Sequence, residues 1–300
     1  MSEFKRGLSD DFVKLLSREA ETRSWWADVL DDAELFIGVR DDCLNVYWRG
    51  ASLFQVEHGE SGLSVTTHPK YLLDSDLSDQ VLLTQGKFDT SWLADHGFMN
   101  VYEGPRSLEK LKKAAELFSK PEKTGCHDVV LNNSHIIDCE IAFPCDNGAE
   151  KGAIRVDLLS LEPNGQLVFW EAKHFKNDDL RAEDDKRPNV CNQIQAYKDY
   201  LSVPQHRSLI EKSYSRVANN LVAIKEMGWK RQLSPLINAT REKNLLMSVG
   251  AEPKVGLVIF GFDRAQREDL EWKKGHLAKL KKEIKLVAAA GEAKNVKLKL

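Results

Sequence analysis

The sequence predicts an α/β protein with a small α+β unit over residues 1 to 104 and a larger unit over residues 105 to 300. Three patterns carry this prediction: four short strand-like runs near the start, two apolar runs around the turn Pro163-Asn-Gly, and the continuous apolar run "KVGLVIFGF". Strand patterns that alternate with helical patterns are typical of a sheet covered by helices.

The first unit begins with an amphipathic helix, which we expect from about Asp10 to Glu21. Four strand-like runs follow, "ELFIGVR", "CLNVYWRG", "SLFQVEH" and "LSVTTH", and they are linked by Asp-Asp, Gly-Ala and Gly-Glu-Ser-Gly. Short strands separated by such turn residues indicate an antiparallel meander.

The second unit begins with the helical pattern "SLEKLKKAAELFSK", and the strand pattern "HIIDCEIAF" follows it. The hairpin around Pro163 comes next, and "NVCNQIQAYKDYL" then predicts a helix. We expect two more helices at about 208–227 and 235–247, a buried strand at "KVGLVIFGF", and a charged helix at the end of the chain. The predicted order is α, β, β, β, α and later β.

Composition and charge narrow the class of protein. Of 300 residues, 42% are hydrophobic and 30% are charged, which is typical of a globular chain. The first residues lack the apolar core of a signal peptide, and no apolar run reaches the roughly 18 residues of a membrane span. We therefore expect a cytoplasmic protein without a membrane partner. The five cysteines are odd in number, which favours reduced thiols.

The net charge of −3 gives no general attraction to nucleic acid. The last thirty residues are locally basic, with "KKGHLAKLKKEIK" and "KNVKLKL". This pattern is typical of a solvated helix face.

The hairpin raises a chemical question, because its apolar runs "RVDLLSL" and "LVFWEAKHF" carry Asp157, Glu171 and Lys173. A charge in a core strand is unfavourable unless it is paired or binds a metal. Residues two apart share one face of a strand, so Glu171 and Lys173 point the same way.

The turn decides whether the charges of the two strands meet. A two-residue loop would place Asp157 opposite Ala172, whereas a three-residue Pro-Asn-Gly loop pairs Glu162 with Gln166 and places Asp157 opposite Glu171. Proline suits the first central position of a type I turn, and glycine suits the left-handed residue that follows it. We therefore predict the three-residue loop.

Two carboxylates in that register repel each other unless a proton or a cation lies between them. A hard divalent cation with oxygen ligands, Mg²⁺ or Mn²⁺, is the expected occupant. The predicted metal ligands are Asp157, Glu171 and the backbone carbonyl of Ala172. Lys173 would lie at the rim of the metal, where it could orient a water or offset charge on a phosphate.

Glu-x-Lys by itself carries no information, because it occurs six times in this chain. The same hairpin would also suit an exposed strand pair with a cross-strand salt bridge. The occurrence at Glu171 differs in that it ends an apolar strand, which a turn joins to a strand that carries Asp157.

Asp157 followed by Glu171-Ala172-Lys173 after a hairpin resembles the PD-(D/E)xK nuclease superfamily. The usual leading proline is absent, and Val156 precedes Asp157. The helix pattern "QIQAY" resembles the Gln-x3-Tyr helix of RecB-type members, with Gln193 and Tyr197 on one helical face.

The resemblance covers about residues 105 to 265 and implies a restriction-endonuclease-like αβββαβ core. It implies that Asp157 and Glu171 bind Mg²⁺, that Lys173 helps to activate the attacking water, and that Gln193 and Tyr197 contact the site or the nucleic-acid backbone. Many members carry a further acidic residue on the first helix. Glu116 on that helix and Glu140 on the first strand are both candidates for this additional acidic residue.

The functional prediction is therefore a metal-dependent nuclease that hydrolyses phosphodiester bonds of nucleic acid, with DNA favoured. The resemblance also suggests restriction, defence or repair as a setting, and a homo-oligomer or a defence-system protein as a partner. The alternative is a non-catalytic nucleic-acid-binding or assembly protein on a nuclease scaffold.

Overall fold

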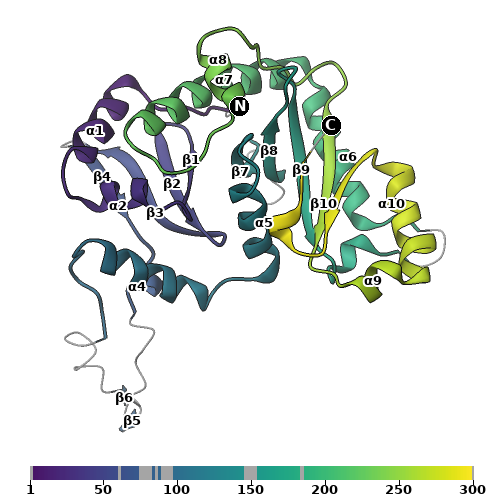
Figure 1. Ribbon diagram of the computed structural model, residues 1–300, viewed down its shortest axis with the longest axis horizontal. Helices are drawn as coiled ribbons and strands as arrows, with labels where there is room; N and C mark the ends of the chain where they lie inside the picture. Colours follow the sequence, from purple (N-terminus) through teal and green to yellow (C-terminus); the bar gives the residue numbers. More distant parts are fainter. Residues whose placement is uncertain are drawn as a thin grey trace.

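Two β-sheets with helices packed on them make up the described chain, which is a mixed α/β fold (Figure 1). The computed structural model describes residues 3–59, 62–73, 83–84, 87–88, 97–144, 154–182 and 186–298. Within these ranges no helix combines the length and the apolar character that crossing a bilayer requires.

The first sheet is the predicted antiparallel meander, which is confirmed. Its strands pair in the order β1-β2-β3-β4. The helix α1 (Asp10–Ala20) begins at the N-cap Ser9, whose side chain accepts a hydrogen bond from the N–H of Phe12. The strands are β1 (Phe36–Val39), β2 (Cys43–Trp48), β3 (Ala51–Gly59) and β4 (Gly62–Thr66), and a second helix, α2 (Trp25–Asp31), precedes them.

The second sheet has five strands in the order β11-β10-β9-β8-β7. Its first three strands in the chain form an antiparallel unit, and β10 and β11 then add in parallel to β9. The bounds are β7 (Ile136–Ala142), β8 (Arg155–Leu161), β9 (Leu167–His174), β10 (Lys254–Phe260) and β11 (Leu286–Ala290).

Helices cover both faces of the second sheet. One face packs against α6 and α7 in one apolar cluster, and the other packs against α5 and residues 293–298 in another. The longer helices are α4 (Pro105–Glu116), α5 (Pro121–Leu131), α6 (Asn189–Ser202), α7 (Pro204–Glu226) and α8 (Pro235–Arg241). The short elements are α9 (Arg264–Glu268), α10 (Leu277–Glu283), β5 (Leu83–Thr84), β6 (Lys87–Phe88), η1 (Pro69–Tyr71), η2 (Asp178–Leu180), η3 (Glu271–His276) and η4 (Ala293–Asn295).

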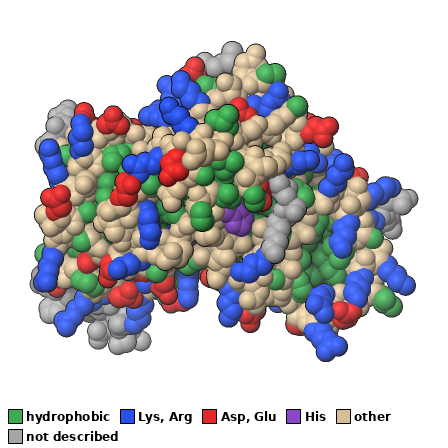
Figure 2. All heavy atoms as spheres, turned by 45° about the horizontal axis from the view of Figure 1, so that its top comes forward, with side chains coloured by type: hydrophobic (Ala, Val, Ile, Leu, Met, Phe, Trp, Pro, Cys, Tyr) green, Lys and Arg blue, Asp and Glu red, His purple; other side chains and the backbone are tan. Residues whose placement is uncertain are grey.

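The end of the chain differs from the prediction. The expected charged C-terminal helix is short, and the chain continues into β11. The apolar run after Lys285 pairs with β10, and Val296 and Leu298 are buried beyond it, so a helix ending the chain was wrong. The basic lysines before this strand are exposed as expected, and Figure 2 shows Lys and Arg side chains gathered at its right edge, over α9 and α10.

Two helix predictions also need correction. The helix expected up to residue 247 ends at Arg241, where residues 242–245 form a turn. A separate helix, α5, follows α4 and was not predicted. Its glycine Gly125 lets it lie close to the sheet, because a Cβ there would be 2.1 Å from the ring of Phe260.

One apolar cluster runs from Phe4 through the first sheet to Ile284 in the second half of the chain. The helix α4, with which the predicted second unit begins, packs against α2 and β3 of the first unit. The two units therefore share a hydrophobic core, and their division at residue 104 stays a prediction.

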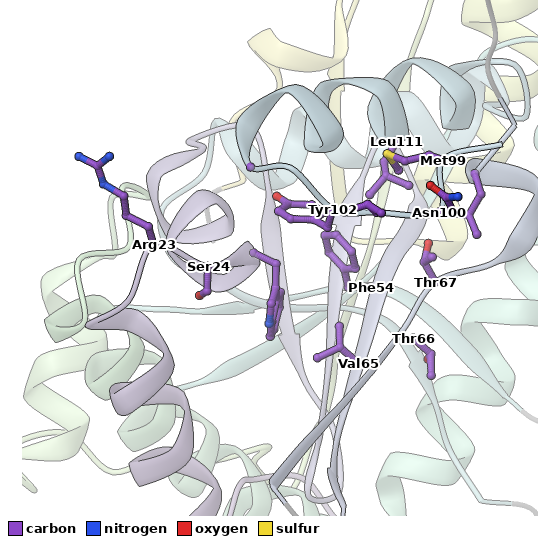
Figure 3. Close-up of a pocket in the computed structure, with 14 residues that line it drawn as sticks. Arg23, Ser24, Phe54, Val65, Thr66, Thr67, Met99, Asn100, Tyr102 and Leu111 are labelled. Carbon is purple, nitrogen blue, oxygen red and sulfur yellow. The ribbon is translucent and has the colours of Figure 1, made fainter. Parts of the chain in front are cut away.

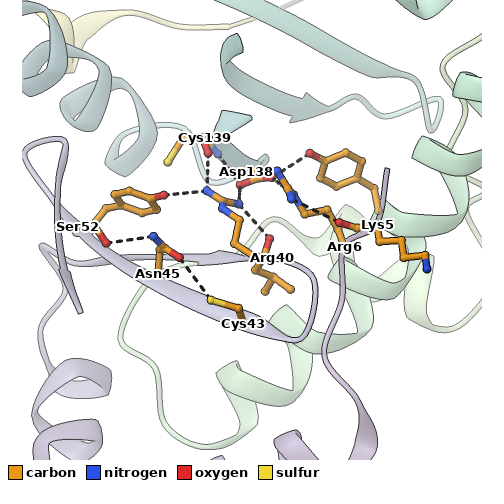
Figure 4. Close-up of polar contacts among 11 residues, drawn as sticks. Lys5, Arg6, Arg40, Cys43, Asn45, Ser52, Asp138 and Cys139 are labelled. Carbon is orange, nitrogen blue, oxygen red and sulfur yellow. Dashed lines mark hydrogen bonds and ion pairs between the residues drawn. The ribbon is translucent and has the colours of Figure 1, made fainter. Parts of the chain in front are cut away.

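A buried charge cluster joins the two sheets (Figure 4). The carboxylate of Asp138 on β7 is fully buried and lies 2.6 Å from the guanidinium of Arg40. Tyr214 of α7 donates to its second oxygen at 2.9 Å, and Arg6 lies 3.6 Å from that oxygen. Arg40 also donates to the backbone carbonyl of Cys139 at 2.7 Å. These contacts fix the first unit against β7, the strand that also carries Glu140.

Candidate active site

The hairpin turn has the three-residue form that the sequence predicts. The N–H of Glu162 donates to the carbonyl of Gln166 at 2.9 Å, and that of Gly165 donates to the carbonyl of Glu162 at 2.9 Å. Gly165 has a φ of +84°, and a Cβ there would lie 2.1 Å from the carbonyl oxygen of Leu246. Both the left-handed backbone and the close approach require glycine.

The strand register is confirmed up to the pair Leu158 and Trp170, and the same offset places Asp157 opposite Glu171. At the next position the N–H of Ala172 donates to the side chain of Asp157, at 2.7 Å from Oδ2. The N–H and C=O of one strand residue face the same neighbouring strand, so the Ala172 carbonyl also faces β8 beside Asp157.

Glu171 and Lys173 are buried side by side on β9. Their side chains are 5% and 8% exposed, and Lys173 Nζ lies 2.7 Å from Glu171 Oε1. This burial excludes the exposed hairpin as an explanation of the charges. The salt bridge also links two residues of one strand and does not cross between strands.

The helix α6 brings Tyr197 onto the same carboxylate. The Tyr197 hydroxyl lies 2.5 Å from Glu171 Oε2 and also contacts the backbone carbonyl of Arg155. Gln193 lies one turn earlier on the same face of α6. Its Oε1 is buried and has no hydrogen-bond partner within the described ranges. One face of α6 therefore carries the Tyr197 hydroxyl, which is hydrogen-bonded to Glu171, and the Gln193 Oε1, which has no hydrogen-bond partner among the described residues.

The two candidates for a further acidic residue lie in different places. Glu116 is exposed and forms an ion pair with Arg49. The charge of Glu140, by contrast, contributes to the raised pKa of Asp157. Glu140 adopts a left-handed φ of +52° within β7, a conformation that is strained for a residue with a side chain.

Two acidic residues near the site were missed from the sequence. Asp179 lies 3.6 Å from Lys173 Nζ. Glu122, in the first turn of α5, accepts hydrogen bonds from the N–H of His174 at 3.2 Å and from Asn177 Nδ2 at 2.8 Å. The dipeptide Pro-Glu at residues 121–122 is a helix-start signal that could have revealed α5 and its acidic residue.

The electrostatics of the site follow from burial and crowding. Burial and the neighbouring Glu171 charge raise the pKa of Asp157 well above its ordinary value. Burial also raises the pKa of Glu171, although Lys173 and Tyr197 act in the opposite direction. For Lys173, burial lowers the pKa, but the charge and hydrogen bond of Glu171, with the charges of Glu122 and Asp157, together outweigh it, and the net pKa shift is upward. The site is therefore a crowded carboxylate pair beside a retained ammonium.

The raised pKa of Asp157 predicts a stability effect with a definite sign. Above the ordinary pKa of 3.8 the folded state binds more protons than the unfolded state, so stability falls as the pH rises through the raised value. Asp157→Asn removes this charge and keeps an acceptor for the Ala172 N–H. Without divalent cations at pH 7, we expect a higher Tm, by about 2–4 °C for each kcal/mol of repulsion relieved, and a flatter pH dependence.

Calorimetric scans between pH 4 and pH 8 measure this difference, with the exposed Asp178→Asn as the matched control. A lower Tm for Asp157→Asn at pH 7 would contradict the expected repulsion.

The donor set fits a hard divalent cation. The Asp157 and Glu171 carboxylates and the Ala172 carbonyl supply oxygen only, and Mg²⁺ is commonly bound through one or two carboxylates with waters and phosphates as its other ligands. Across the described part of the chain, no group of three or more His, Cys, Asp or Glu side chains is arranged to hold a metal ion. The two carboxylates and the carbonyl would leave the other coordination positions of such a cation to water or to a further ligand.

A cavity of about 570 Å³ lies between the first unit and α4 (Figure 3). The ring of Phe54 lies 6.3 Å from that of Tyr102 and 5.6 Å from that of Trp25. Its described lining residues fall between Arg23 and Leu111. The cavity is therefore separate from the strands that carry Asp157 and Glu171.

Comparison with protein-family models, with curated proteins and with solved structures finds no match to this chain. The functional argument therefore depends on the geometry of the site.

Proposed function

We propose that this protein is a metal-dependent nuclease of the PD-(D/E)xK type that hydrolyses phosphodiester bonds of nucleic acid, with DNA as the favoured substrate. One observation carries the proposal. Asp157, Glu171 and Lys173 meet at the end of an antiparallel hairpin, where Glu171 and Lys173 are buried in contact. Buried charges with shifted pKa values are concentrated at functional sites.

The order of elements supports the proposed class. From α5 to β10 the chain forms a helix, three antiparallel strands, the helices α6, α7 and α8, and a strand parallel to β9. This order is compatible with the αβββαβ core that the resemblance implies, with α7 and α8 as additions to it. The contact between Tyr197 and Glu171 agrees with the second element of the resemblance, the Gln-x3-Tyr helix.

In the proposed site Asp157, Glu171 and the Ala172 carbonyl hold Mg²⁺ or Mn²⁺. When bound, the cation would polarise a phosphoryl oxygen as a Lewis acid. The Tyr197 hydroxyl fixes the orientation of the Glu171 carboxylate. Gln193 supplies a buried acceptor that a water or a substrate hydrogen-bond donor could satisfy.

Lys173 contributes mainly as a cation in this proposal. Because its pKa is raised by Glu171, its Nζ keeps its proton and can donate to a phosphate oxygen. Charge builds on the phosphoryl oxygens as the bond breaks, so a fixed ammonium stabilises the transition state more than the ground state. Taking a proton from water would first require Lys173 to lose its own.

The test is a cleavage panel with plasmid, linear duplex DNA, single-stranded DNA and RNA in the presence of Mn²⁺ or Mg²⁺. We expect cleavage of at least one DNA substrate and none in EDTA. Asp157→Asn and Glu171→Gln should each abolish it, because each removes a ligand charge. If the protein binds nucleic acid but does not cleave it in the presence of any divalent cation, the non-catalytic alternative is favoured.

A further inference from the structure

A groove of about 450 Å³ lies between the two units, and Arg155, two residues before Asp157, is among its lining residues. Its walls come from the β2–β3 turn, η1, the link between α4 and α5, and the facing ends of β7 and β8. The lining residues are Tyr47, Arg49, Gly50, Ala51, Ser52, Lys70, Tyr71, Phe118, Ser119, Lys120, Lys123, Glu140 and Arg155. Both halves of the chain therefore contribute to one groove.

The groove is basic, although the chain as a whole carries a net charge of −3. Five of its lining residues are Lys or Arg, and Glu140 is the acidic one. Lys123 lies 3.8 Å from Glu140, and Arg49 pairs with Glu116 outside the groove. The remaining excess of positive charge indicates an anionic ligand.

Two aromatic rings, those of Tyr71 and Phe118, lie among these cations. Phe118 is 49% exposed, and Lys70 Nζ lies 5.0 Å from the centre of its ring. The same ammonium lies 4.9 Å from the ring of Tyr71. A basic groove with an exposed ring is the arrangement that binds unstacked bases and their phosphates.

One end of the groove meets the candidate site. Arg155 lies two residues before Asp157, and its backbone carbonyl accepts from the Tyr197 hydroxyl that also contacts Glu171. Glu140, which lines the groove, lies on β7, the strand that pairs with β8 beside Arg155. A strand lying in the groove would therefore lead directly to the carboxylate pair.

The size of the groove favours a single strand. Pockets of about 300–1,000 Å³ enclose small ligands, so the groove's volume of about 450 Å³ suits one or two nucleotides of a strand. Stacking on Phe118 also requires a base that is free of its partner strand.

We propose that this groove binds a single-stranded stretch of DNA, with a base stacked on Phe118 and phosphates held by Lys120 and Arg155. The inference rests on the proposed function, because it takes the groove as the path by which the scissile strand reaches Asp157 and Glu171. It adds the substrate class and a role for the first unit, whose Arg49 and Lys70 complete the wall.

The test measures binding of a labelled single-stranded DNA 12-mer to the full chain in EDTA, by fluorescence anisotropy. The affinities of a DNA duplex and of a single-stranded RNA of the same sequence are measured for comparison. We expect the single-stranded DNA to bind most tightly. Phe118→Ala should weaken binding roughly five- to hundredfold, the effect of one lost base-stacking contact, and Phe118→Trp should restore it.

The double variant Lys120→Ala/Arg155→Ala should reduce the slope of log affinity against log salt by about 1.4, because each phosphate contact on a single strand contributes about 0.7. Lys281→Ala/Lys282→Ala removes the same charge from exposed positions of α10 and should leave the slope unchanged. Tighter binding of duplex or RNA, or equal effects of the two double variants, would overturn the inference.

The two proposals fail separately in this design. If single-stranded DNA is cleaved but the groove variants bind it like the native chain, the groove is wrong and the nuclease stands. If the groove variants lose binding but no substrate is cleaved with any divalent cation, the nuclease is wrong and the groove stands.

Discussion

Replacing Lys173 with alanine is expected to lower the turnover of metal-dependent cleavage by about two orders of magnitude or more, the usual scale for a lost transition-state contact. The ammonium lies 2.7 Å from Glu171, where it would face a phosphate bound to a cation that the carboxylate pair would hold. Divalent-cation binding should persist, because Lys173 contributes no oxygen ligand.

The measurement combines cleavage kinetics at saturating Mn²⁺ with the Mn²⁺-dependent shift in Tm. Lys176→Ala is the matched control, since Lys176 is an exposed lysine three residues further along. A variant that cleaves as fast as the native chain would remove Lys173 from the mechanism. Loss of the Mn²⁺ shift together with cleavage would mean that Lys173 supports the metal site and not the chemical step.

The second large effect concerns the buried cluster between the two sheets. Asp138→Asn should destabilise the fold by about 3–5 kcal/mol, because it leaves Arg40 buried without its counter-charge. We expect Tm to fall by about 6–20 °C, at about 2–4 °C for each kcal/mol. Urea unfolding followed by circular dichroism measures the free energy directly.

Asp41→Asn, an exposed substitution one residue from Arg40, is the control and should change stability little. Arg40→Met should resemble Asp138→Asn, and the double variant should lose much less than the sum of the two. If the double variant loses as much free energy of unfolding as the two single variants together, Asp138 and Arg40 do not act as a pair.

The sequence predicts the local features of this fold well and the long-range ones less well. The meander follows from turn residues between short strands, and the hairpin register follows from Pro163-Asn-Gly. Both features could therefore be predicted from short stretches of sequence. The strand β11 was missed because its pairing with β10 is non-local and its small residues lie in a charged segment. Burial of that segment depends on the sheet edge and not on its own pattern.

The residues of the candidate site also differ in whether a local sequence pattern could predict them. Asp157, Glu171 and Lys173 stand on two adjacent strands, so strand periodicity and one turn were enough to bring them together. Glu122 and Asp179 come from elements that approach only after α5 and the loop after β9 have packed. Their role near the site depends on tertiary contacts that no local pattern contains.

The buried Asp138 cluster also limits how such a chain could be rearranged. Its carboxylate belongs to β7, while its guanidinium partners, Arg6 and Arg40, belong to the first unit. A foreign recognition module fused in place of the first unit would leave a bare carboxylate in an apolar interior unless it supplied its own arginines. The first unit and β7 are therefore coupled through this cluster, and a change to one of them would require a matching change in the other.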